Sequence, residues 1–129
     1  MIFSSAIFYK NKKKLFSYKG NDAIIDYFCI MNVKISVIRK TSYPDLSARY
    51  ENPIEHTCDL SEGDVFISHD GLRPEGLCPS AWGSMKEFVE ELARGGGNFY
   101  DGWMKNPRSA MISCNDGFRP VSFLLETLD

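Results

Sequence analysis

Residues 110–128 read AMISCNDGFRPVSFLLETL, and this stretch decides the fold of the chain. Two apolar runs flank the step from Asp116 to Gly117. Apolar runs on either side of Asp-Gly are a strong local sign of a β-hairpin with a tight turn, because both residues tolerate a positive φ. Pro120 cannot donate a ladder hydrogen bond. Its strand therefore either lies at a sheet edge there or begins just after Pro120.

Three further regular elements are expected upstream of this hairpin. Val33, Ile35 and Val37 alternate with their neighbours along 31–38, which predicts a strand, and the apolar run 65–67 predicts a second one. Prolines within 41–60 and 72–79 predict loops, with room for a short helical turn near 46–50. Between the two strand pairs, apolar residues recur at helical spacing and predict one long helix; they are Ala81, Met85, Phe88, Val89 and Leu92.

The start of this helix has two interpretations. Pro79 suits the first helical position, which would make Cys78 the cap residue. Alternatively, Ser84 and Glu87 form a capping box, and a shorter helix begins at Ser84. At the other end, three consecutive glycines, 95–97, stop the helix.

The order strand, strand, helix, strand, strand predicts a small α+β domain. We expect a small, mainly antiparallel sheet with one principal amphipathic helix packed on one face. Residues 1–30 mix aromatic residues and lysines without a clear period. We therefore expect that 1–30 is an N-terminal extension outside the domain and that 31–129 forms the single domain. The alternative is a first strand or helix that packs on the body.

The composition of the 129 residues narrows the class of protein. Apolar residues make up 43% of the chain and charged residues 25%, which suits one globular domain. The formal net charge of -2 provides no basic field for a phosphate backbone, so we expect no nucleic-acid partner. No apolar run reaches the roughly 20 residues that span a bilayer. With no secretory signal recognised, we expect a cytoplasmic protein with reduced thiols and no membrane partner.

Two motifs resemble the signatures of a family of very small, uncharacterised prokaryotic proteins. The first motif is the run 74–78, PEGLC, followed by Ala81-Trp82, and the second is the run 114–123, CNDGFRPVSF. The run 100–103, YDGW, is similar to the family's linking segment. The chain departs from the pattern at Leu77, where an aromatic residue is usual. The resemblance covers about 31–126, implies a natural start at Met31, and implies no activity, since none is established for the family.

Candidate chemistry gathers at the helix start and at the hairpin turn. As a helix cap, Cys78 would meet free backbone N–H groups and the positive helix end, which stabilise a thiolate. Cys114 ends a strand beside the turn, and Arg119 across the hairpin could stabilise its thiolate or hold a carboxylate. The structural alternatives are cysteines that only pack, an Asp116–Arg119 pair that only holds the turn, and tryptophans, Trp82 above all, that pack in the core and do not line a pocket.

A zinc site is a weaker hypothesis. It would use Cys58, Cys78 and Cys114, with His56 or His69 added, but no closely spaced ligand pair is present in the sequence. We therefore predict no metal and name no cofactor.

Three functions fit these residues. The first is a binding or accessory protein with a pocket between the helix start and the hairpin, for a small, anionic molecule or the terminus of a protein partner. The second is a thiol-dependent enzyme or redox protein. The third is a structural module that forms a homo-oligomer through the apolar hairpin face. The residues expected at the pocket are Cys78 and Cys114 as candidate catalytic thiols and Trp82, Trp103, Asp116 and Arg119 as candidate ligand-binding residues.

Overall fold

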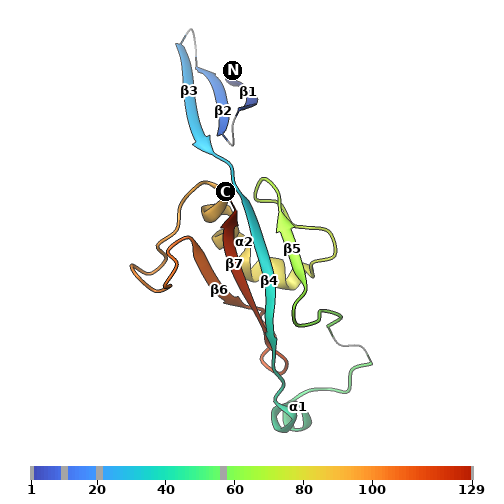
Figure 1. Ribbon diagram of the computed structural model, residues 1–129. Helices are drawn as coiled ribbons and strands as arrows, with labels where there is room; N and C mark the ends of the chain where they lie inside the picture. Colours follow the sequence, from blue (N-terminus) through green and yellow to red (C-terminus); the bar gives the residue numbers. More distant parts are fainter. Residues whose placement is uncertain (1, 10–11, 20–21, 56–57, 129) are drawn as a thin grey trace.

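The computed structural model describes residues 2–9, 12–19, 22–55 and 58–128, with side chains from residue 30 onward (Figure 1). Four strands form an antiparallel sheet in the order β5–β4–β7–β6. Helix α2 packs on this sheet, so the α+β class expected from the sequence is confirmed. The elements of this part are β4 (Asn32–Lys40), α1 (Pro44–Tyr50), β5 (Val65–Ser68), α2 (Pro79–Ala93), β6 (Ser109–Ser113) and β7 (Val121–Leu128).

Residues 2–29 contain three further strands that pair with one another in an antiparallel sheet of their own, in the order β1–β2–β3. The sequence showed no clear period here, and these strands were not predicted. That 1–30 lies outside the natural domain stays a prediction. The three strands are β1 (Ile2–Tyr9), β2 (Lys12–Lys19) and β3 (Asp22–Cys29).

The centre of the four-stranded sheet is the pair β4–β7. Their antiparallel register runs from Asn32 opposite Leu128 to Lys40 opposite Val121, with an irregularity between Val37 and Arg39. Strand β5 pairs with the other edge of β4, and β6 pairs with the other edge of β7. Strand β7, which comes last in the sequence, therefore lies in the interior of this sheet, beside β4, the strand of this sheet that comes first in the sequence.

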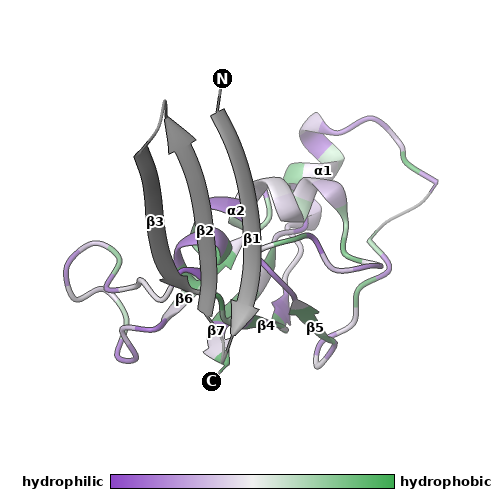
Figure 2. Ribbon diagram, turned by 90° about the horizontal axis from the view of Figure 1, so that it is seen from above, coloured by the Kyte–Doolittle hydropathy of each residue, from purple (hydrophilic) through white to green (hydrophobic). Residues whose placement is uncertain are grey.

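The core lies between one face of this sheet and α2. Because side chains alternate along a strand, every second residue of β4 and β7 points to the helix. The apolar stripe of α2, which the sequence predicts, packs against these side chains. Figure 2 views the strands nearly end-on and shows α2 on one side of them. The principal core residues, all at most 9% exposed, are Val33, Ile35, Val37, Ala81, Met85, Val89, Leu92, Ala110, Ile112, Val121, Phe123 and Leu125.

Helix α2 begins at Pro79 with Cys78 as its cap residue, which decides between the two predicted starts. The later alternative is wrong, because Ser84 lies inside the helix and its hydroxyl donates to the Ser80 carbonyl at 3.3 Å. The helix ends as the glycines predict. Gly95 has φ +89° and donates its N–H to the Leu92 carbonyl, as is usual for glycine after a helix.

The predicted C-terminal hairpin is confirmed, but the prediction of a tight turn at Asp116-Gly117 is wrong. The ladder closes at Ser113 opposite Ser122, and a longer connection joins the strands. Gly117 does not adopt positive φ. Instead, the Asp116 carboxylate accepts the N–H groups of Phe118 at 2.8 Å and Arg119 at 3.1 Å. Aspartate commonly stabilises turns in this way.

This connection is also held by a segment far away in the sequence. Thr41 donates its N–H to the Pro120 carbonyl, and Tyr43 donates to the Phe118 carbonyl. Strand β7 begins at Val121, directly after Pro120, so the second of the two predicted positions for this proline is confirmed. The expected short helical turn near 46–50 is also present as α1, beginning at Pro44.

No helix among the residues that the structure describes is long and apolar enough to cross a membrane.

The burial of β7 predicts a large difference between two leucine truncations. Leu125 is 0% exposed at the centre of the core, whereas Leu72 is 67% exposed in the loop after β5. Leu125→Ala should lower the free energy of unfolding by about 2–5 kcal/mol, because it removes buried hydrocarbon and leaves a cavity. Leu72→Ala should change it by less than about 0.5 kcal/mol. Urea denaturation followed by circular dichroism measures both, and equal losses would contradict the assigned core.

Candidate functional site

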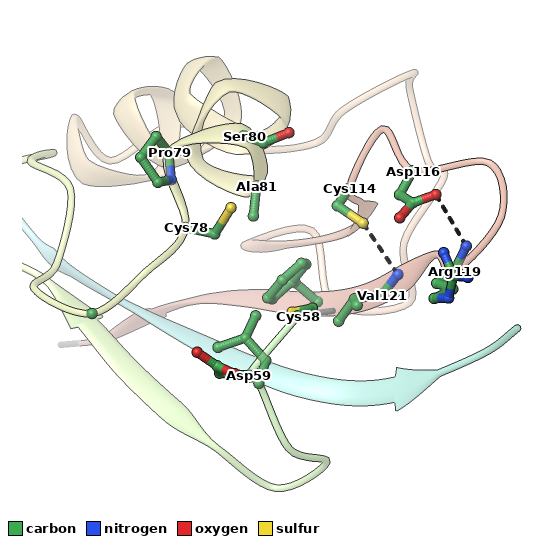
Figure 3. Close-up of a pocket in the computed structure, with 13 residues that line it drawn as sticks. Cys58, Asp59, Cys78, Pro79, Ser80, Ala81, Cys114, Asp116, Arg119 and Val121 are labelled. Carbon is green, nitrogen blue, oxygen red and sulfur yellow. Dashed lines mark hydrogen bonds between the residues drawn. The ribbon is translucent and has the colours of Figure 1, made fainter. Parts of the chain in front are cut away.

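A cavity of about 490 Å³ opens between the start of α2, the segment before β5 and the β6–β7 connection (Figure 3). Its volume lies within the range of small-molecule sites. Core residues that face α2 close its floor, and three cysteines lie in its wall. The lining residues are Cys58, Asp59, Leu60, Gly76, Cys78, Pro79, Ser80, Ala81, Cys114, Asp116, Arg119, Val121 and Phe123.

Cys78 enters the site as the cap residue of α2. Its side chain is exposed and makes no capping hydrogen bond. Pro79 follows and has no N–H to donate. In an α-helix the next N–H groups, those of Ser80 and Ala81, have no acceptor within the helix. Both residues line the cavity, so the positive end of α2 borders it.

Cys114 lies across the cavity from Cys78, as Figure 3 shows. It is partly buried and pairs with Val121 twice. Its N–H donates to the Val121 carbonyl at 3.0 Å, and its Sγ accepts the Val121 N–H at 3.3 Å. The structure therefore brings Cys78 and Cys114 to one cavity, as the sequence predicted.

The Arg119 guanidinium is held by a residue that the sequence analysis missed. Nη2 lies 2.8 Å from Glu51 Oε1, and Nη1 donates to Oε2 at 3.0 Å. The two side chains are 29% and 17% exposed. The hydrogen bond to Glu51 raises the pKa of Arg119. Desolvation lowers this pKa, and the negative charges of Glu51 and Asp116 raise it further. Arg119 therefore remains a cation throughout the neutral range.

This two-pronged pair corrects two hypotheses about Arg119. The carboxylate that it holds belongs to Glu51, the residue at the end of α1, and the structure shows no contact to the Cys114 thiol among the hydrogen bonds of the described residues. Asp116 contacts Arg119 through the backbone N–H and not through the guanidinium. Both Asp116 and Arg119 nevertheless line the cavity, where the Glu51 carboxylate offsets the arginine charge.

Neither tryptophan lines this cavity, in contrast to our expectation. Trp82 is partly buried and packs against the core. Successive helical residues are rotated by about 100°, so Trp82 lies off the direction in which Ala81 faces the cavity. Trp103 lies in the loop after α2, where its ring stands edge-on to Tyr100 at a centroid distance of 5.3 Å.

The zinc hypothesis finds no support in the described part of the chain. Cys58, Cys78 and Cys114 all line the cavity, but no three His, Cys, Asp or Glu side chains of the described residues are grouped as metal ligands. His69 instead lies 3.1 Å from the Asn32 side chain through Nδ1. His56, the other histidine of this hypothesis, lies outside the described residues.

Comparison of the chain with protein-family models, curated proteins and solved structures found no match. The two motifs that suggested a family thus remain a resemblance.

The Arg119–Glu51 pair predicts a local effect on α1. This helix has no buried residues, so its attachment depends on the ion pair and on the backbone contacts of 41–43. Glu51→Gln should speed amide hydrogen exchange at Ser47 and Glu51, because a neutral amide cannot form the charged two-pronged contact. Exchange at Ile35, in the central strand, should stay unchanged.

Glu55→Gln is the matched control, since Glu55 is an exposed glutamate in the same segment. It should leave exchange in α1 as it is in the unmodified protein. Unchanged exchange at Ser47 in the Glu51→Gln protein would show that the pair does not anchor the helix. Mass spectrometry after deuterium labelling makes the measurement, on peptides that cover 41–51 and on a peptide that contains Ile35.

Proposed function

We propose that this protein binds a small molecule that has a hydrocarbon part and one anionic end, such as a carboxylate. The observation that carries the proposal is the cavity of about 490 Å³, whose apolar floor meets the start of α2. At this start the side chain of the cap residue, Cys78, makes no capping hydrogen bond. The helix start suits the anionic end of such a ligand, and the apolar floor suits its hydrocarbon part.

The anionic end is assigned to the first turn of α2. The N–H groups of Ser80 and Ala81 have no acceptor within the helix, and the partial positive charge of a 15-residue helix lies there. Helix starts of this kind bind carboxylates and phosphates through backbone N–H groups. Because Glu51 offsets the charge of Arg119, the helix start is the anion-binding part of the cavity in this proposal.

The hydrocarbon part is assigned to the floor, where Leu60, Val121 and Phe123 turn toward the cavity. Burial of apolar surface there contributes about 25 cal/mol for each Å² removed from water. Asp59 and Asp116 both line the wall, and their negative charges disfavour ligands with two or more negative charges. The cavity therefore favours a monoanion over a phosphate.

Hexanoate tests this proposal directly. We expect it to shift the backbone amide signals of Cys78, Ser80, Cys114 and Val121 in a ¹⁵N NMR titration at millimolar concentration. 1-Hexanol, which keeps the chain and lacks the charge, should bind more weakly, and inorganic phosphate, which lacks the chain, should do likewise. If hexanoate leaves these signals in place, or shifts no more than hexanol does, the proposed ligand class is wrong.

Three variants sharpen the test without touching the core. Cys58 is exposed, so Cys58→Trp should fold normally while its ring fills the cavity and weakens hexanoate binding. Glu55→Trp adds the same ring outside the cavity and should bind hexanoate as before. Asp116→Asn keeps an oxygen acceptor for the turn and removes a negative charge, so it should tighten hexanoate binding about two- to fivefold.

A second candidate function is thiol chemistry at the same cavity. The observation that favours it is the hydrogen bond from the Val121 N–H to Cys114 Sγ, together with the place of Cys78 at the start of α2. The thiolate is the nucleophilic form of cysteine. A thiol enzyme or redox protein would use one of these two sulfurs.

Alkylation rates distinguish this candidate from binding alone. Thiol chemistry predicts that Cys78 or Cys114 reacts with iodoacetamide several-fold faster than Cys58 at neutral pH. Cys58 serves as the internal reference, because it is exposed and lines the same cavity. Peptide mass spectrometry after timed quenching measures each site. Equal rates at all three cysteines would exclude the thiol function and leave hexanoate binding unaffected.

A further inference from the structure

A second cavity, of about 520 Å³, lies along the C-terminal half of α2. It is independent of the first one, since the two share no lining residue. One wall is the outer side of the helix, and the other is the loop that follows it, orange in Figure 1. We call it the α2–loop groove; it is lined by Glu87, Phe88, Glu90, Glu91, Arg94, Gly97, Phe99 and Tyr100.

One wall of the groove is aromatic. Phe88 of α2 lies 5.0 Å from Phe99 and 6.5 Å from Tyr100 between ring centroids. Tyr100 in turn meets Trp103 at 5.3 Å, nearly edge-on. Tyr100 is 75% exposed, so its ring is open to solvent and to a ligand. The faces of aromatic rings carry partial negative charge.

The loop that carries Tyr100 is fixed by hydrogen bonds in an uncommon backbone conformation. Asn98 donates its N–H to the Pro107 carbonyl at 2.7 Å, and its side chain accepts the Gly102 N–H at 3.1 Å. Asn98, Tyr100 and Asp101 have φ of +51°, +52° and +51°. Gly97 has φ +155°, and a side chain there would collide with the Pro107 carbonyl. Such strain persists where the surrounding structure enforces it, and it concentrates at functional sites.

The charged side chains of the groove are mainly acidic. Glu87, Glu90 and Glu91 line it, and Arg94 is the one basic side chain among the described lining residues. Arg94 is already paired with Glu91 at 2.7 Å. Lys86 reaches Glu90 only at 3.9 Å, with both side chains well exposed. The groove thus combines an excess of negative charge with exposed ring surface.

We propose that the α2–loop groove binds an organic cation, an alkylammonium or guanidinium group. The cation would lie against the Tyr100 ring and receive the charge of Glu87 and its neighbours. Cation–π attraction and carboxylate attraction act on the same group here, so the groove discriminates by charge and not only by size. An uncharged molecule of the same shape would gain neither contribution.

Choline and 3,3-dimethyl-1-butanol test this inference, because they have the same shape and only choline is charged. In ¹⁵N NMR titrations of the full chain, choline should shift the amide signals of Phe88, Gly97 and Tyr100, and the alcohol should shift them far less. A second arm uses the peptide Gly-Arg-Gly. Tighter binding of the peptide would identify a peptide side chain as the natural source of the cation, and tighter binding of choline would identify a small alkylammonium compound.

Three variants separate the two attractions. Tyr100→Leu keeps an apolar side chain without a ring and should weaken choline binding about two- to fivefold. Glu87→Gln should weaken it by a similar factor, with a smaller salt dependence than the parent protein shows. Arg94→Gln removes a competing cation and should tighten binding. Tyr50→Leu is the matched control, since Tyr50 is 68% exposed on α1, away from the groove.

The inference is overturned if choline and the alcohol shift the groove signals equally, or if neither shifts them at millimolar concentration. It is also overturned if Arg94→Gln weakens choline binding while the thermal midpoint of the variant is unchanged. The thermal midpoints of all four variants establish that each one is folded.

Discussion

The antiparallel pairing of β4 with β7 joins residues that are 81 to 96 positions apart, and the rest of the structure depends on it. It sets Val33, Ile35 and Val37 beside Phe123 and Leu125 on one face of the sheet. An amphipathic helix is held mainly by the apolar surface that covers its stripe. Helix α2 therefore takes its position from this strand pair, and both cavities border α2.

Local patterns were sufficient to predict the four strands of the larger sheet and helix α2, but not β1, β2 and β3. The strands of the sheet and α2 were found because their apolar residues follow the period of the element, which packing on one face requires. The tight turn was wrong because Asp-Gly is compatible with more than one turn geometry. The backbone hydrogen bonds between 118–120 and 41–43 favour the longer connection, and no sequence pattern near Gly117 predicts these contacts.

The candidate site was predicted in part, for the same reason. Cys78 and Cys114 could be brought together because each lies at the end of an element whose packing partner was evident. Trp82 was misplaced by one residue of helical rotation, which motif spacing does not resolve. Glu51 lies 68 positions before Arg119 in the sequence, and only the path of the chain through α1 makes them partners. Ion pairs of this kind leave no periodic pattern to find.

The two cavities differ in the charge that they favour, and the direction of α2 explains why. A helix carries partial positive charge at its start and partial negative charge at its end. The first cavity lies at the start and is proposed to take an anion; the α2–loop groove lies toward the end and is proposed to take a cation. In the groove, Glu87 and Glu91 add to the field of the helix, whereas in the first cavity Asp116 opposes it.

This difference has a consequence for the selectivity of the two cavities. Where side-chain charge and helix field act together, cations of various shapes gain from both, and the Tyr100 ring has to provide the selection. Where the two oppose each other, charge attracts a ligand only close to the N–H groups of the first turn. Under the proposed function, a ligand of the first cavity is therefore selected by how well its hydrocarbon part fills the floor while its anionic end reaches Ser80 and Ala81.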